Sequence, residues 1–307
     1  MRRTARRFGW IAVGAAGLLW CASVNGQPIS ESIKAAGAKR HYWLVVPANA
    51  DAGNPLPVVL LFHGAGLNGI ALQNRGFTTL ALKEKFIAVY PDALDGLWDG
   101  GRVYVGGRGD DIRFVSTLLD SLAKRFPVDP RRIYATGESN GAIFCYTLAA
   151  RLSERIAAIA PVAGELSVDI VRRFPPKEPV AVMAFNGTSD RFVPFDGVPE
   201  AALMSATRSV ATWRIWDGCA APPDTRDLSL DEADQKAGLQ VGRIDFSGGR
   251  GGAEAILYVI KGGGHTWPGF NTDPVWAKRA GKTAQSINAT QLIWTFFMAH
   301  PKGRAAQ

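Results

Sequence analysis

The residues Gly137-Glu138-Ser139-Asn140-Gly141 place a serine between two glycines in the spacing G-x-S-x-G. They follow an apolar run, Ile133–Thr136, and open an expected helix, Asn140–Leu152. A sharp strand-to-helix turn of this kind presents a serine hydroxyl for attack on an acyl group, and small flanking residues leave room for its strained backbone. We therefore expect Ser139 to be a nucleophile, with an ordinary turn serine as the alternative.

A serine nucleophile needs a general base, and the chain has four histidines. His265 follows three glycines in a loop directly after the expected strand Ala255–Ile260, a position where α/β enzymes present catalytic groups. His41 falls inside an expected strand, His63 begins a glycine-rich turn, and His300 lies at the end of the last expected helix. We expect His265 to be the base, and a structural loop histidine is the alternative.

An acid must orient this histidine and stabilise its protonated form. Asp190 lies in a loop after the expected strand Val180–Phe185, and Asp196, six residues later, is the rival candidate. A turn-capping role for Asp190 is the third possibility. The order Ser139, Asp190, His265 along the chain is the order of α/β-hydrolases and differs from that of other triad folds.

The fourth requirement is a pair of donors for the negative oxygen that forms during acyl transfer. One is expected to be the backbone N–H of Asn140, directly after the nucleophile. The other should come from the loop after an early strand, and the segment His63-Gly64-Ala65-Gly66 offers the N–H of Ala65. A simple glycine turn is the alternative for this segment.

These residues must be positioned by alternating strands and helices, which predict an α/β fold with a mostly parallel sheet flanked by helices. Asp111–Phe126 carries its apolar residues on one helical face, and Asp110 is expected to cap it. Gly248–Gly252 is expected to form a hairpin loop. The expected strands are His41–Pro47, Val58–Phe62, Phe86–Tyr90, Ile133–Thr136, Ile156–Val162, Val180–Phe185, Val241–Phe246 and Ala255–Ile260, and the other expected helices are Leu72–Lys85, Asn140–Leu152, Glu200–Trp216 and Ala284–Ala299.

The N-terminus has the pattern of an export signal. Basic residues in positions 1–7 precede an apolar run, Phe8–Ala22, that is too short for an ordinary transmembrane helix, and small polar residues follow. We expect residues 1–26 to be a cleaved secretory signal and 27–307 to form one catalytic domain, secreted or periplasmic, without stable membrane insertion. A retained anchor is the alternative.

Composition argues against several other classes of protein. Hydrophobic residues make up 47% of the chain, which is typical of a globular protein. The net charge of +8 includes four arginines within the first seven residues, so the remaining excess does not require a nucleic-acid partner. No Cys or His pair has the spacing of a zinc site, and we expect neither a metal nor another cofactor. Cys145 is expected to be a buried small hydrophobic residue.

Several segments together resemble the secreted polyhydroxybutyrate depolymerase and feruloyl esterase family of α/β-hydrolases, over almost all of residues 27–307. The most specific are the serine segment and Gly264-His265-Thr266-Trp267-Pro268-Gly269, because GHTWPG is the sequence of the histidine loop in this family. The resemblance implies a triad at Ser139, Asp190 and His265. It also implies a disulfide near Cys219, but the later strand region lacks the second cysteine. The other matching segments are His63–Gly66, Trp98–Arg102, Asp110–Phe114, Asp129–Tyr134, Ala160–Gly164 and Asn186–Asp190.

The resemblance implies a serine esterase that works through an acyl-enzyme on a small or oligomeric ester substrate. We expect a compact acyl group, hydroxycinnamoyl, acetyl or hydroxyalkanoyl, because no long apolar insertion offers a lid for lipids. Trp267, two residues after the base, is expected to line the acyl site, and Trp98 is a second candidate; packing beneath a loop is the alternative for both. A peptidase or acyltransferase on the same fold, or a catalytically silent binding protein, are the competing functions.

Overall fold

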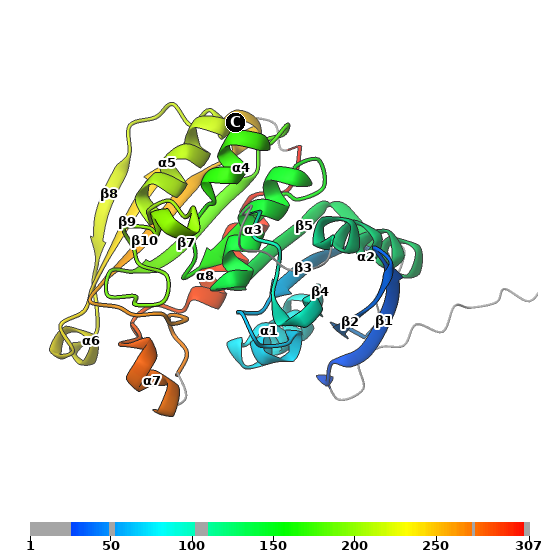
Figure 1. Ribbon diagram of the computed structural model, residues 1–307, viewed down its shortest axis with the longest axis horizontal. Helices are drawn as coiled ribbons and strands as arrows, with labels where there is room; N and C mark the ends of the chain where they lie inside the picture. The colour runs from blue at the N-terminus through cyan, green and yellow to red at the C-terminus, as the bar shows by residue number, and fades with distance from the viewer. Residues whose placement is uncertain (1–25, 49–52, 102–109, 272–273, 304–307) are drawn as a thin grey trace, which may run out of the picture.

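A computed structural model describes residues 26–48, 53–101, 110–271 and 274–303 (Figure 1). Its strands form one sheet in the order β1-β2-β4-β3-β5-β6-β7-β10-β9-β8. The strands are β1 (Ile29–Ala35), β2 (Ala38–Val45), β3 (Leu56–Phe62), β4 (Ile87–Pro91), β5 (Val128–Glu138), β6 (Ala158–Val162), β7 (Ala181–Gly187), β8 (Asp224–Leu228), β9 (Gln240–Phe246) and β10 (Ala255–Lys261). The helices are α1 (Phe77–Glu84), α2 (Asp111–Arg125), α3 (Asn140–Arg151), α4 (Val168–Arg173), α5 (Ala206–Asp217), α6 (Glu232–Lys236), α7 (Pro274–Ala280) and α8 (Ala289–Ala299).

The centre of the sheet is parallel, as the strand–helix alternation predicts. Strands β4, β3, β5, β6, β7 and β10 pair in parallel, whereas β1, β2, β8 and β9 add antiparallel neighbours at the two sides. Every residue of β3, β4, β6 and β7 is buried, as expected for strands covered on both faces. This is the α/β-hydrolase arrangement, and it brings the carboxyl ends of the parallel strands to one edge.

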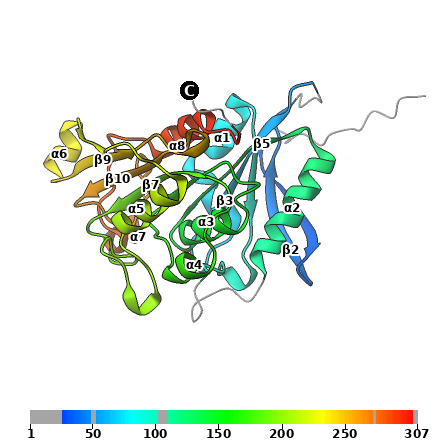
Figure 2. The ribbon, with the colours of Figure 1, turned by 90° about the horizontal axis from the view of Figure 1, so that it is seen from above.

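Two helical layers enclose this sheet (Figure 2). Helices α2, α3, α4 and α5 bury their apolar sides in the cluster on one face, which includes Phe114, Phe144 and Trp213. Helices α1 and α8 cover the other face, where Phe77 and Trp294 belong to a second cluster. The side chain of Asp110 accepts a hydrogen bond from the N–H of Arg113, so the expected cap of α2 is confirmed.

Several expected boundaries were wrong. The helix expected over Leu72–Lys85 is split at Gly76, whose φ of 81° ends a 3-10 helix, Gly69–Arg75, before α1 begins. Helices α5 and α8 begin at Ala206 and Ala289, each after a residue whose side chain caps it, several residues later than their apolar patterns indicated. The hairpin between β9 and β10 is confirmed, whereas β1, β8, α4, α6 and α7 were not anticipated.

The two cysteines beyond residue 26 are both free thiols. Cys145 is fully buried on α3, as expected, and burial raises its pKa well above the ordinary value. Cys219 is also buried, and its Sγ lies 3.6 Å from the carbonyl oxygen of Ala253. Of the expected signal segment 1–26, only Gly26 lies within the described residues. No described helix combines the length and the apolar character that a membrane crossing requires.

A buried carboxyl joins α5 to the start of β7. Asp217, at the end of α5, accepts a hydrogen bond of 3.0 Å from the N–H of Val180 through Oδ1. Its Oδ2 is buried and has no partner among the described residues. Burial raises the pKa of Asp217 to about 7, although the hydrogen bond from Val180 opposes the shift. Because the folded carboxyl binds its proton more tightly than the unfolded one, the folded state loses stability as pH rises from about 4 to 7.

Replacing Asp217 by Asn should therefore raise the free energy of unfolding by about 1–3 kcal/mol at pH 8 and by roughly a third of that amount at pH 5. The amide keeps the oxygen that accepts from Val180 and cannot ionise, so the cost of a buried charge disappears. Urea unfolding of the Asp217→Asn variant and the parent at both pH values measures the difference. An equal difference at pH 5 and pH 8 would contradict the explanation.

Candidate active site

Ser139 occupies a strained turn between β5 and α3. Its backbone has φ 59° and ψ −123°, a region that side-chain-bearing residues rarely adopt. The turn is packed tightly against β3, because a Cβ added to Gly141 would overlap the carbonyl oxygen of Phe62 and one added to Gly137 would lie 2.6 Å from it. The two glycines of the motif therefore allow the turn that presents Ser139 at the edge of the sheet.

Replacing Gly141 by Ala should disrupt this turn. The new methyl group would meet backbone atoms of Phe62 and His63, which cannot rotate away. We expect a loss of about 1–3 kcal/mol in stability and roughly a hundredfold in kcat/KM, because small displacements of a nucleophile are costly. Gly242→Ala is the matched control, since a Cβ there lies 3.5 Å from Asp227 Oδ1, an ordinary contact. Near-normal activity and melting temperature in Gly141→Ala would show that the turn tolerates a side chain.

His265 and Asp190 are paired at the ends of the adjacent parallel strands β10 and β7. His265 Nδ1 lies 2.7 Å from Asp190 Oδ2, and both side chains are buried. Asp190 Oδ1 accepts hydrogen bonds from the N–H groups of Phe192 (2.8 Å) and Val193 (2.9 Å), which fix the carboxylate. The rival acid, Asp196, is exposed. The contact to Asp190 orients the His265 ring, with Nδ1 as its donor, and leaves Nε2 for a substrate or a nucleophile.

Backbone contacts hold the two loops of this pair together. The N–H of Ser189 donates to the carbonyl of Gly263 at 2.8 Å, and the N–H of His265 donates to the carbonyl of Ala280 at 2.6 Å. A Cβ on Gly264 would overlap that same carbonyl oxygen. The glycines before His265 thus let the histidine loop lie directly against neighbouring backbone.

The other histidines have structural environments. His63 is fully buried after β3, with Nδ1 2.7 Å from the carbonyl oxygen of Gly64 and Nε2 accepting from the N–H of Ala93 at 3.0 Å. Burial lowers the pKa of His63, so this ring favours the neutral form. His300 Nδ1 lies 2.8 Å from the carbonyl oxygen of Phe296, and His41 is exposed on β2.

The loop after β3 lies beside the serine. A Cβ on Gly64 would be 3.5 Å from Cβ of Ser139, so this segment passes directly over the nucleophile. Ala65 is exposed, and the next N–H, from Gly66, donates to the carbonyl of Gly96 at 2.8 Å. On the other side, Asn140 begins α3, where the first N–H groups of a helix have no acceptor within the helix. Ala65 and Asn140 are therefore placed on the two segments that flank Ser139.

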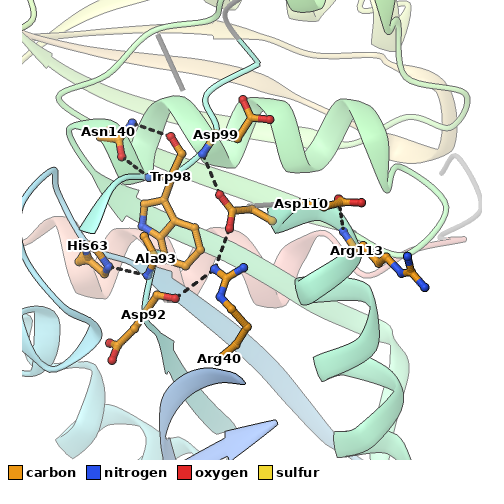
Figure 3. Close-up of polar contacts among 10 residues, drawn as sticks. Arg40, His63, Asp92, Ala93, Trp98, Asp99, Asp110, Arg113 and Asn140 are labelled. Carbon is orange, nitrogen blue, oxygen red and sulfur yellow. Dashed lines mark hydrogen bonds and ion pairs between the residues drawn. The ribbon is translucent and has the colours of Figure 1, made fainter. Parts of the chain in front are cut away.

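The side chain of Asn140 clamps a third loop in place (Figure 3). Its Oδ1 accepts from the N–H of Trp98 at 2.8 Å, and its Nδ2 donates to the carbonyl of Trp98 at 3.2 Å. The same loop is held one residue later, where the N–H of Asp99 donates to Asp111 Oδ2 at 2.8 Å. Arg40 pairs with Asp111 Oδ1 at 2.7 Å in a fully buried ion pair, which ties β2, α2 and this loop together.

The two tryptophans expected at the substrate site are both buried. Trp98 is inaccessible and stacks on Phe144 with ring centroids 5.0 Å apart, so it contributes through its backbone contact to Asn140. Trp267 is 1% exposed, and its Nε1 donates to Thr290 Oγ1 at 3.1 Å on the side of the sheet covered by α8. The expected role of either indole as a wall for the acyl group was wrong, and packing beneath the loops is what the structure shows.

Sequence reasoning missed a second carboxyl next to the acid. Glu165 is fully buried, and its Oε1 accepts from Asn186 Nδ2 at 3.1 Å, while Oε2 has no partner among the described residues. Burial, with a further contribution from the Asp190 carboxylate, raises the pKa of Glu165 well above its ordinary value. Glu165 therefore favours the neutral form. A glutamate directly after the small-residue segment that follows β6 is the signal that could have identified it.

Within the described ranges, no group of three or more His, Cys, Asp or Glu side chains is arranged to hold a metal ion. The edge of the sheet at the carboxyl ends of β5, β7 and β10 instead carries the hydroxyl of Ser139 and the imidazole–carboxylate pair of His265 and Asp190. This set can perform acyl transfer by a covalent intermediate.

Comparisons with known proteins identify similarities to esterases. No protein-family profile matches the chain. It is 24% identical to feruloyl esterase D of Neurospora crassa over 78% of each chain, and 30% identical to poly(3-hydroxyalkanoate) depolymerase C of Paucimonas lemoignei over 39% of this chain and 30% of that one. The solved acetyl xylan esterase of Aspergillus awamori superimposes with a TM-score of 0.57 at 13% identity, over 88% of this chain and 99% of that one, which supports the fold. The named relatives support a carboxylic ester hydrolase.

Proposed function

We propose that this chain is an exported serine esterase in which Ser139, His265 and Asp190 act as nucleophile, general base and orienting acid. The observation that carries the proposal is the contact of His265 with Asp190 at the same sheet edge as the strained Ser139 turn. A strained backbone of this kind costs free energy and is found mainly at functional sites, which supports a role for Ser139 as the nucleophile.

In the acylation step, Ser139 Oγ attacks the carbonyl carbon of the ester while its proton passes to His265 Nε2. The carbonyl oxygen becomes negative and is stabilised by the N–H groups of Ala65 and Asn140. The tetrahedral intermediate then breaks the bond to the leaving oxygen, and His265 returns the proton to that oxygen. The products of this step are the free alcohol and the acyl group bound to Ser139.

In the deacylation step, His265 accepts a proton from water as the water oxygen attacks the acyl carbon. The second intermediate breaks the bond to Ser139 Oγ, which recovers the proton, and the carboxylic acid leaves. Asp190 remains ionised and stabilises the protonated imidazole in both steps.

The relatives named feruloyl esterase and poly(3-hydroxyalkanoate) depolymerase support a compact hydroxycinnamoyl or hydroxyalkanoyl acyl group. The earlier argument from Trp267 no longer contributes, because that indole is buried. Export is supported by the basic and apolar pattern of residues 1–22.

The test is hydrolysis by the purified protein of p-nitrophenyl acetate, butyrate and octanoate, methyl ferulate and a hydroxybutyrate dimer, beside peptide anilides. We expect ester hydrolysis, covalent labelling of Ser139 by a fluorophosphonate, and kcat/KM that falls from the short esters to octanoate. Faster cleavage of the anilides would instead identify a peptidase, and preference for octanoate would refute the compact acyl group.

A further inference from the structure

A buried histidine holds the peptide unit that contains the N–H of Ala65. His63 Nδ1 lies 2.7 Å from the carbonyl oxygen of Gly64, and the His63 side chain is fully buried. This carbonyl and the N–H of Ala65 belong to the same peptide unit, so in the trans form they point in opposite directions. A contact that fixes the carbonyl therefore also fixes the direction of the N–H of Ala65.

The contacts of His63 determine where its proton lies. The carbonyl oxygen of Gly64 can only accept a hydrogen bond, so Nδ1 must be the donor. The N–H of Ala93 donates to Nε2 at 3.0 Å, so Nε2 must be the acceptor (Figure 3). The ring is therefore neutral, carries its proton on Nδ1, and uses both of its nitrogens to hold backbone groups.

A loop after β4, residues 92–98, contacts both segments that carry the expected oxyanion donors, and we call it the bracing loop. It is bound twice to residues 63–66, through the Nε2 contact and through the carbonyl of Gly96, which accepts an N–H from that segment at 2.8 Å. At its other end, Trp98 exchanges hydrogen bonds of 2.8 Å and 3.2 Å with the side chain of Asn140 (Figure 3). The bracing loop thus joins two donor segments that follow different strands, β3 and β5.

The peptide unit after Gly64 needs such a contact because glycine gives the backbone unusual freedom to rotate. A rotation by half a turn would direct the carbonyl oxygen of Gly64, instead of the N–H of Ala65, at the oxygen that becomes negative during acyl transfer. Donors stabilise that oxygen most when their direction is fixed before the reaction. The Nδ1 contact of His63 opposes this rotation, because the rotation would leave a buried donor without its acceptor.

We infer that His63 is a positioning residue that holds the N–H of Ala65 in the direction that an oxyanion donor requires. The inference rests on the proposed esterase function. Because His63 is buried, it acts through the carbonyl of Gly64 on one side of its ring and through the bracing loop on the other.

Two amide substitutions separate the roles of the two ring nitrogens. His63→Asn places an amide nitrogen where Nδ1 lies and keeps the donor to Gly64, whereas His63→Gln reaches toward Ala93, as Nε2 does, and loses that donor. We expect kcat for p-nitrophenyl acetate to fall by about tenfold to a hundredfold in His63→Gln and by less than about fivefold in His63→Asn, with KM within about twofold of the parent in both. His300→Gln, which removes another buried histidine whose Nδ1 contacts a carbonyl oxygen, is the matched control and should keep the kcat of the parent.

The two chemical steps give a second readout that a purely structural role would not produce. Acylation and deacylation each form a negative oxygen, so His63→Gln should slow both steps by similar factors in single-turnover experiments. Equal losses of kcat in His63→Asn and His63→Gln, a rise in KM in place of a fall in kcat, or slowing of one step alone would overturn the inference.

A measurement on the parent protein does not require either variant to fold. The 15N chemical shifts of the His63 ring should show a neutral imidazole with its proton on Nδ1. A ring protonated on Nε2 could not donate to Gly64 and would overturn the inference by itself. If the parent hydrolyses no ester and Ser139 is not acylated, the proposed function fails; if the parent is active and His63→Gln is equally active, only the role of His63 is refuted.

Discussion

The Ser139→Ala variant should lose about four to six orders of magnitude in kcat for ester hydrolysis while its fold stays intact. Without the hydroxyl no acyl-enzyme can form, and the remaining rate comes from backbone donors and substrate binding that act on a direct attack by water. His265→Ala should fall by a similar factor, because the two side chains act as one unit. Initial rates on p-nitrophenyl acetate and mass spectrometry of the acylated protein measure both effects.

Ser229→Ala is the control for this prediction, since Ser229 is exposed in the loop after β8, the outermost strand of the sheet and two strands beyond β10. The Ser139→Ala protein should also keep the far-UV circular dichroism spectrum of the parent. Its melting temperature should stay within a few degrees of the parent's or lie above it, because the substitution leaves the backbone of the turn unchanged. Activity within about tenfold of the parent would refute Ser139 as the nucleophile.

The position of the serine turn and of the histidine could be predicted because both depend on local patterns. Gly137 and Gly141 must be glycines because a Cβ at either position would overlap the backbone of Phe62. The G-x-S-x-G spacing in the sequence already indicates this requirement. Strands rich in Val and Ile are buried on both faces, so their order of appearance indicates a parallel sheet whose carboxyl ends converge. Asp190 and His265 meet for this reason, although 75 residues separate them.

The substrate side could not be predicted in the same way. Trp267 lies two residues after His265 in the chain, but its indole lies on the face of the sheet that α1 and α8 cover, where it contacts Phe77 and Thr290. Proximity in sequence does not determine the direction of a side chain in an irregular loop. Phe192 and Trp276 meet by stacking across a long stretch of chain, and α7 itself has no apolar periodicity that would announce it.

The edge strands β1 and β8 were missed because antiparallel pairing with a neighbouring strand stabilises them, whereas their own sequences lack a clear apolar pattern. Strand β8 has the sequence DTRDL and is almost entirely exposed, so no apolar alternation marks it, and antiparallel pairing with β9 holds it in place. Strand β1 alternates partly buried and exposed residues against β2, in a segment next to the expected signal. The break at Gly76 depends on a left-handed backbone that the apolar pattern of the surrounding helix concealed.

The Asp190→Asn variant should lose about three to four orders of magnitude in kcat, somewhat less than Ser139→Ala. An asparagine can turn its amide nitrogen toward His265 Nδ1, which would stabilise the ring form whose Nε2 carries the proton and cannot accept one from Ser139. It also removes the negative charge that stabilises the protonated imidazole. The rate at several pH values, with melting temperatures to exclude unfolding, measures this loss.

Glu165→Gln is the matched control, because it removes a second buried carboxyl only a short way from the first. Burial and the nearby Asp190 carboxylate raise the pKa of Glu165, so at neutral pH the parent already holds a neutral group there, and glutamine keeps an oxygen to accept from Asn186. We expect kcat of Glu165→Gln to stay within about tenfold of the parent near pH 7. If Glu165→Gln falls as far as Asp190→Asn, then Glu165 supplies the negative charge that His265 needs, and the assignment of the orienting acid to Asp190 alone is wrong.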